Sequence, residues 1–275
     1  MCGSATSKVL GKRMNRSQGL RPSHHEGITT TVVRCRRCGL VYSNPQPVPR
    51  SIDQHYEVDP DCYWPEEGDR DFTSQIATFD RLYLGSKRVA LDIGAGTGEN
   101  LVALQAAGFS AQGIEPSRPF YERAFERGVN VAQVRIEQAQ FHPETFSLVS
   151  FASVLEHLCD PAEAIATALK WCEPQGLIHA EVPSARWLTS RLINAAYRLQ
   201  GLDYVTNLSP MHPPYHLYEF TLESFRAHSA NHGYAVIDHT IYEGTKTYLP
   251  IPGLQTVMRH TGMGMELEVW LRKLR

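Results

Sequence analysis

The chain has 275 residues, of which 42% are hydrophobic, and its formal net charge at pH 7 is −2. This composition predicts a soluble globular protein with one large domain and a smaller additional unit. The charge balance gives no electrostatic reason to expect binding to nucleic acid or to an anionic membrane. No apolar run approaches the about 20 residues that cross a bilayer, and no secretion signal is evident. A cytoplasmic protein with mostly reduced cysteines is therefore expected.

Residues 1–50 are predicted to form a basic N-terminal segment, which an acidic stretch follows. Before about residue 30 the sequence has neither helical nor strand periodicity, and this predicts a weakly ordered segment. The run TTTVVRCRRCGLVYSNPQPVP then gives β-branched residues, a turn at Cys38 and Gly39, and a proline-rich exit. A hairpin followed by a linker is expected there.

Residues 51–87 are predicted to be a linker that leads into a cover helix. In DFTSQIATFDRLYL the apolar residues recur at helical spacing, at Phe72, Ile76, Phe79, Leu82 and Tyr83. Such a stripe predicts a helix that packs against the following domain.

From Arg88 onward, strand-like and helix-like segments alternate. Strands are predicted at 88–93, 111–115, 130–134, 146–151 and 176–183, and helices at 98–107, 117–127 and 161–172. This alternation predicts an α/β fold, a parallel sheet with helices on both faces. After a helix at 221–233, the runs YAVIDHTIYEG and MELEVWLRKLR predict an antiparallel pair of strands at the sheet edge, with no helix between them.

The first of these strands ends in Gly94-Ala95-Gly96-Thr97-Gly98, at the place where open α/β sheets bind ligands. The G-x-G-x-G spacing differs from the dinucleotide fingerprint, and the Gly-Lys-Ser/Thr phosphate loop is absent. Glu115, one strand later, stands where a carboxylate binds ribose hydroxyls, and Asp92 can accept hydrogen bonds from turn N–H groups or, through water, from a ligand ammonium. These residues together indicate S-adenosylmethionine, although a glycine turn can also be only a packing corner.

The motifs LDIGAGTGENL, GIEPS, FSLVSFASVLEHLCDP and GLIHAEVPS resemble those of class I S-adenosylmethionine-dependent methyltransferases in order and spacing. The resemblance implies a Rossmann-like, seven-stranded, mostly parallel sheet with an antiparallel final strand and helices on both faces. It also implies a cofactor site with these members: Asp92, Gly94, Ala95 and Gly96 around the methionine moiety, Glu115 on the ribose, Ser117 beside the adenine, Glu137 and Gln138 near the adenine edge, and Ala152 and Ser153 on the methyl side.

Methyl transfer is an in-line displacement at a sulfonium methyl, so a base is needed only if the acceptor must lose a proton. His157, in VLEHL after the fourth strand, is one candidate base. His212 and His216 are two more, in a lid-like insertion at 184–220 whose amphipathic first half is predicted to fold back as a helix. His157 could instead hold the loop or the cofactor, and the aromatic residues of the insertion could belong to the core.

CRRCGL, Cys35 to Leu40, has the C-x-x-C-G turn of one zinc-ribbon knuckle. Cys2, which a glycine follows, resembles the end of a second knuckle, and many methyltransferases of this type carry a small zinc ribbon ahead of the fold. Cys2, Cys35 and Cys38 could therefore hold zinc, with His24 or His25 as the fourth ligand. A zinc-ribbon-like hairpin without metal is the alternative.

The sequence thus predicts an enzyme that methylates an O, N or C centre of a small molecule, such as a sugar or a specialised metabolite. One alternative is a methyltransferase of a macromolecule, tRNA or protein, docked through the basic N-terminus; the other is a non-catalytic scaffold that keeps the cofactor fold. The predicted domains are 1–50, 51–87 and 88–275. Neither nucleic acid nor a membrane is an expected partner, and the sequence does not specify the acceptor or the oligomeric state.

Overall fold

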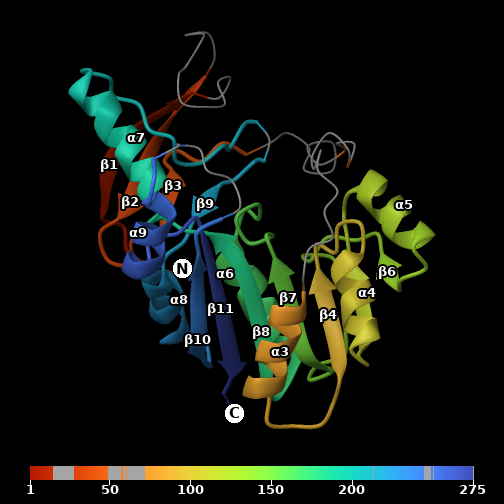
Figure 1. Cartoon of the computed structure of the whole chain (residues 1–275). Helices are drawn as coiled ribbons and strands as arrows, with labels where there is room; N and C mark the ends of the chain where they lie inside the picture. Colours follow the sequence, from red (N-terminus) through yellow and green to blue (C-terminus); the bar gives the residue numbers. More distant parts are fainter. Residues whose placement is uncertain are drawn as a thin grey trace.

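The structure is a computed structural model that describes residues 1–14, 28–48, 57, 60, 72–212, 214–244, 249 and 251–274. Two sheets form its framework (Figure 1). The larger has seven strands in the spatial order β10 (Tyr234–Tyr242), β11 (Glu266–Lys273), β8 (Cys172–Pro183), β7 (Phe146–Ala152), β4 (Val89–Ile93), β5 (Ser110–Ile114) and β6 (Val131–Ala132). The smaller has four strands in the order β1 (Ser7–Met14), β2 (Thr29–Cys35), β3 (Val41–Ser43) and β9 (Tyr218–Glu219).

The large sheet is parallel from β8 to β6 and is covered on both faces, as the alternation predicted. Neighbouring residues on its strands point to opposite faces, because side chains alternate along a strand. On one face, Val149 and its neighbours pack under α6 (Pro161–Trp171) and α8 (Leu222–Ser229). On the other, Leu148 and its neighbours pack under α3 (Thr73–Leu82), α4 (Glu99–Ala106) and α5 (Arg118–Glu126). The predicted cover helix is confirmed as α3, which packs against this face of the sheet with its buried Phe79.

The antiparallel final strand is also confirmed, since β11 lies between β8 and β10 and is antiparallel to both. The expectation of no helix between β10 and β11 was wrong. Helix α9 (Leu254–Thr261) occupies part of this connection, and it buries only Leu254 and Met258. A stripe of two apolar residues in a short polar helix is too weak a periodic signal to recognise in the sequence.

The segment before residue 30 was predicted to be weakly ordered, and for its described part this was wrong: β1 pairs with β2 over its whole length, from Ser7 opposite Cys35 to Met14 opposite Thr29. In the sequence SKVLGKRM, three cationic residues and a glycine interrupt the alternation of apolar and polar residues that would predict a strand. The strand forms because it pairs with β2. The predicted hairpin is confirmed as β2 and β3. Strand β9, which belongs to the 184–220 insertion, pairs with β3 in antiparallel orientation.

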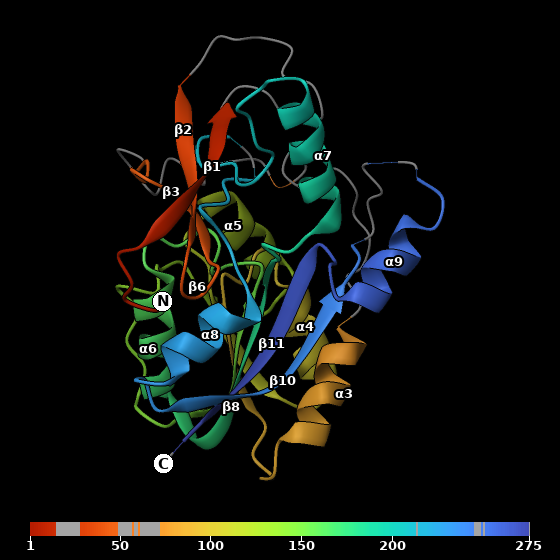
Figure 2. The ribbon, with the colours of Figure 1, turned by 90° about the vertical axis from the view of Figure 1, so that its left-hand side faces the viewer.

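The insertion begins with the predicted amphipathic helix, α7 (Leu188–Leu199). The small sheet and α7 stand above the carboxyl ends of the parallel strands, as both ribbon views show (Figure 1, Figure 2). A ligand at the carboxyl end of β8 would therefore lie beneath this cap, defined here as β1, β2, β3 and residues 184–212 and 214–220. No helix in the described ranges is long and apolar enough to cross a bilayer.

Candidate functional site

The turn after β4, Gly94–Gly98, adopts a backbone that requires glycine. Gly94, Gly96 and Gly98 have φ of +69°, +55° and +86°, in the left-handed region that disfavours side chains. A Cβ at Gly94 would lie 2.6 Å from Val154 Cγ2, and one at Gly98 would lie 2.8 Å from Val129 Cγ2. A Cβ at Gly96 would meet no atom within 4 Å, so Gly96 borders open space. The outer glycines serve packing, and the middle one leaves room for a ligand.

Glu115 fastens this turn to the end of β5. The N–H of Ser117 donates to its Oε1 at 2.8 Å, and the N–H of Gly96 donates to its Oε2 at 2.9 Å. Burial raises the pKa of Glu115 to about 7, against the lowering effect of these two hydrogen bonds, and Asp92 raises it further. A ligand that donates hydrogen bonds to this buried carboxylate would stabilise its charged form.

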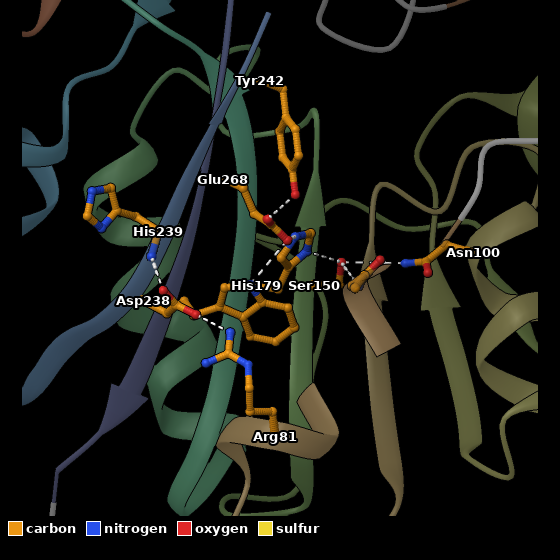
Figure 3. Close-up of polar contacts among 10 residues, drawn as sticks. Arg81, Asn100, Ser150, His179, Asp238, His239, Tyr242 and Glu268 are labelled. Carbon is orange, nitrogen blue, oxygen red and sulfur yellow. Dashed lines mark hydrogen bonds and ion pairs between the residues drawn. The ribbon is translucent and has the colours of Figure 1, made fainter. Parts of the chain in front are cut away.

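A row of polar side chains, buried except for Tyr242 at its end, crosses the large sheet from the glycine turn toward β10 (Figure 3). Asp92, Ser150 and His179 lie opposite one another on β4, β7 and β8. The row consists, in order, of Asp92, Asn100, Ser150, His179, Glu268 and Tyr242, with successive polar atoms separated by 2.9, 3.5, 3.2, 3.1 and 2.7 Å. It links the turn residues of β4 to a carboxylate on β11.

The hydrogen bonds of this polar row have a defined direction. Burial acts to raise the pKa of Glu268, but bonds from His179, Tyr242 and Trp270 outweigh it and lower the pKa, so Glu268 is a carboxylate. His179 Nε2 therefore donates to Glu268, and its Nδ1 lies 3.2 Å from the Ser150 hydroxyl. The Ser150 oxygen then accepts from Asn100, whose Nδ2 also donates to Asp92. The row thereby fixes how Asn100 and Asp92 are oriented.

Sequence reasoning identified Asp92 but missed the rest of this row. The available signal was that Ser150 and His179 each lie between apolar neighbours within a strand, since polar side chains at such positions need partners. Their pairing depends on strand register, which one sequence does not supply.

The methyl-side and adenine-side candidates also lie at carboxyl ends of strands. Ala152 is the last residue of β7, and Ser153 follows it with φ +59°, a strained value for a non-glycine residue. The N–H of Ser153 donates to the carbonyl of Glu181 at 2.9 Å, which holds this turn beside β8. Glu137 and Gln138 lie in an exposed turn after β6.

The three candidate bases come together in one histidine cluster, defined as Glu156, His157, His212 and His216. The rings of His157 and His216 are 5.0 Å apart, and Glu156 Oε1 is 3.8 Å and 3.9 Å from their Nε2 atoms. Burial lowers the pKa of His216 well below its usual value, and the nearby His157 and His212 lower it further. His216 is therefore a neutral imidazole at pH 7 with an unprotonated ring nitrogen, although the lowered pKa makes it a weaker base than an exposed histidine.

Arg13 joins this cluster from the small sheet and was missed by sequence reasoning. Its Nη2 lies 3.4 Å from His212 Nε2, and its Nε donates to the carbonyl of Leu208 at 2.9 Å. The ligand atoms of Glu156, His157 and His216 lie within 4.8 Å of one another, a spacing that also suits a divalent cation. The cluster can thus accept a proton or hold a metal ion.

The three cysteines form a thiol cluster under the hairpin turn. The sulfur atoms of Cys2, Cys35 and Cys38 all lie within 4.8 Å of one another, and those of Cys2 and Cys35 are 3.4 Å apart. Burial acts to raise the pKa of Cys35, but backbone N–H groups of the turn and the neighbouring thiols outweigh it and lower the pKa; burial raises the pKa of Cys38. The predicted fourth ligands His24 and His25 lie outside the described residues.

A family model described as a methyltransferase domain matches residues 69–239, more than half of the chain. A ubiquinone biosynthesis O-methyltransferase of Photobacterium profundum is 33% identical over 93 residues, which are 31% of this chain and 40% of that protein. The chain therefore spans less than half the length of that relative.

Two solved S-adenosylmethionine-dependent methyltransferases share the fold. The one from Archaeoglobus fulgidus has a TM-score of 0.51 at 18% identity, over 74% of this chain and 95% of that chain. The one from Methanosarcina mazei has a TM-score of 0.52 at 15% identity, over 71% of this chain and 96% of that chain.

Proposed function

Because the chain belongs to the class I S-adenosylmethionine-dependent methyltransferase family, we propose that it binds this cofactor and transfers its methyl group to a small organic molecule. The observation that carries the proposal is the glycine turn: Asp92 and Glu115, two buried carboxylates at the carboxyl ends of adjacent strands, flank a turn whose middle glycine, Gly96, borders open space. A positively charged ligand with hydroxyl donors fits such a place.

The cofactor supplies an electrophilic methyl group on a sulfonium. In the proposed site Asp92 and the turn residues Gly94, Ala95 and Gly96 hold the methionine moiety, and Glu115 accepts from the ribose hydroxyls. Further residues hold the remaining parts: Ser117, Glu137 and Gln138 the adenine, and Ala152 and Ser153 the methyl side. The fit is supported by Glu115, whose raised pKa reflects a buried carboxylate that ribose hydroxyls would stabilise.

We place the acceptor beneath the cap, between the cofactor and the histidine cluster. In this proposal His216 accepts the proton that an O or N acceptor loses, while His157, His212 and Glu156 hold its ring in place. A small-molecule acceptor is supported by the Photobacterium relative, whose name assigns it to ubiquinone biosynthesis. An acceptor that is already nucleophilic would need no base.

We also propose that the thiol cluster holds a structural zinc ion through Cys2, Cys35 and Cys38. The convergence of three sulfur atoms and the lowered pKa of Cys35 support this, because zinc binds thiolates. The ion would fix the hairpin turn that begins β3.

Calorimetric titration of the full chain with S-adenosylmethionine, and separately with S-adenosylhomocysteine, tests the cofactor proposal. We expect both to bind, and Glu115→Gln to weaken binding by about 10- to 100-fold, since a hydrogen bond to a charged group is lost. Glu122→Gln, an exposed carboxylate on α5 paired with Arg118, is the matched control and should bind as the natural chain does. No binding by the folded natural chain would refute the proposal.

Release of S-adenosylhomocysteine in a panel of hydroxylated and amino compounds then tests the acceptor class. Turnover with small molecules supports the proposal. Turnover only with tRNA or with a protein substrate would refute the small-molecule assignment.

A further inference from the structure

A cavity of about 520 Å³ lies between α7 and the strands β1 and β2, apart from the glycine turn and the histidine cluster. Helix α7 stands beside β1 in both ribbon views (Figure 1, Figure 2). Four of the lining side chains are cations, Lys8, Arg34, Arg191 and Arg198. We propose that this cavity binds a small organic molecule through a phosphate or diphosphate group.

Lys8, Arg34, Arg191 and Arg198 line one cavity, and among the described residues no carboxylate lines it with them. Lys8 lies directly opposite Arg34 in the β1–β2 pair, and like charges at such a position repel. Arg191 and Arg198, two turns of helix apart on α7, line the same cavity. Burial lowers the pKa of Arg34, and repulsion by Arg191 and Arg198 lowers it further, against the attraction of Glu219. An anion in the cavity would relieve this repulsion.

The guanidinium groups are held by uncharged partners. Arg34 Nη2 donates to the carbonyl of Ala185 at 3.1 Å, and Arg198 Nη2 donates to the carbonyl of Leu10 at 3.2 Å. Arg34 Nε is buried and has no hydrogen-bond partner. Within the described residues, none of the four cations forms an ion pair. Oriented N–H donors that lack an acceptor are what an oxyanion requires.

The nearby carboxylate Glu219 does not fill this role. It accepts hydrogen bonds from Asn207 Nδ2 at 2.6 Å and from the N–H of Leu208 at 3.1 Å, and burial raises its pKa. Its two oxygens are thus directed toward other donors, and the four cations keep an excess of positive charge.

The rest of the wall indicates the size and chemistry of the ligand. Leu188, Leu192 and Met263 form apolar surface beside the cations, and the volume lies in the range of small-ligand pockets. Four cations match the charge of a phosphate or diphosphate ester better than that of one carboxylate. A ring or chain carried by the phosphate would lie against the apolar side.

Titration of the full chain with inorganic diphosphate and with phenyl phosphate, at constant ionic strength, tests the site and needs no methyl donor. We expect both to bind, and Arg198→Gln and Arg34→Gln each to weaken binding by about tenfold or more, because charge-assisted hydrogen bonds are lost. Arg198 is exposed on α7, so its variant remains informative if Arg34→Gln does not fold. The matched control is Arg226→Gln, on α8, which should leave binding unchanged.

Absence of binding would overturn the proposal, and so would an equal loss of affinity in Arg226→Gln, which would indicate unspecific ion binding. Single-stranded RNA that binds more tightly than diphosphate, and loses affinity in Arg198→Gln, would also overturn it and indicate a nucleic-acid surface.

A further pair of measurements identifies where the phosphate comes from. Turnover with a phosphorylated acceptor but not with its unphosphorylated form would assign the cavity to the acceptor itself. Turnover without phosphate, at a rate that diphosphate changes in the natural chain but not in Arg198→Gln, would assign it to a separate anion. Because the titration itself requires no cofactor, failure of the proposed methyl transfer would leave this site intact.

Discussion

The glycine turn and the histidine cluster differ in how far apart along the chain their residues lie. Asp92, the three glycines and Glu115 all belong to one β-α-β unit, where strand pairing places them side by side. The histidine cluster instead combines the end of β7 with the 184–220 insertion, and Arg13 reaches it from β1. We call the glycine turn with Asp92 and Glu115 the cofactor half of the proposed site, and the histidine cluster with the cap the acceptor half. Because they come from separate parts of the chain, substitutions in one half should leave the other half's function unchanged.

The largest expected effect separates the two halves in the simplest way. His216→Ala should lower kcat by about 100- to 10,000-fold, the range for loss of a general base, while the affinity for S-adenosylmethionine stays the same. Initial rates with an acceptor from the panel, together with calorimetry, measure both. His239→Ala, an exposed histidine on β10, is the control. Turnover that EDTA abolishes and a divalent cation restores would instead assign a metal to Glu156, His157 and His216.

Loss of the thiol cluster should disturb the acceptor half and spare the cofactor half. We expect one zinc per chain by metal analysis, none in Cys35→Ser, and a lower melting temperature for that variant. Zinc contributes roughly 10 kcal/mol of folding free energy in small zinc domains, and the variant should lose a part of this. Cofactor affinity should hold at temperatures where the variant is folded. His24→Ala and His25→Ala test the fourth ligand, and Cys159→Ser, an exposed thiol, is the control. A natural chain purified without zinc and unable to bind it would contradict this prediction.

Within the cofactor half, Glu115 should make stability depend on pH. Its pKa is about 7 in the folded chain, above the value of 4.5 for an exposed Glu. The folded state therefore binds the extra proton, and stability falls as pH rises from about 4.5 to 7. Glu115→Gln removes this loss, so the difference in unfolding free energy between variant and natural chain should grow from pH 5 to pH 8 by up to about 3 kcal/mol. Urea titrations measure it; a constant difference would show that Glu115 titrates normally.

The smallest effect concerns the polar row behind the turn. Ser150→Ala removes the acceptor that orients Asn100 and should weaken cofactor binding by about tenfold, with rescue by Ser150→Thr, which keeps the hydroxyl. Ser147→Ala is the matched control, since Ser147 is equally buried on β7 but bonds only the backbone of Val89. Equal losses in the two alanine variants would mean that general destabilisation, and not orientation of Asp92, lowers the affinity.

The same distinction explains what the sequence could predict. The parallel sheet, its antiparallel last strand, the cover helix and the positions of Asp92, Gly96 and Glu115 follow from local periodicity and from spacing within one structural unit. Strand β1, Arg13, and the pairing of Ser150 with His179 and Glu268 were not predictable, because each depends on contacts between residues distant in sequence. The three histidines were named as candidates, but only the folded chain shows that His157 and His216 adjoin Glu156.

The position of β11 has a consequence for how the chain folds during synthesis. This strand supplies the neighbours of both β8 and β10, yet it is made after them. Until residue 273 leaves the ribosome, β8 exposes an unpaired edge, β10 has no partner, and Glu268 and Trp270 are missing from beneath His179. The nascent chain would therefore present two open strand edges to chaperones or to other chains, and ribosome profiling with chaperone capture should find it bound until synthesis passes this point.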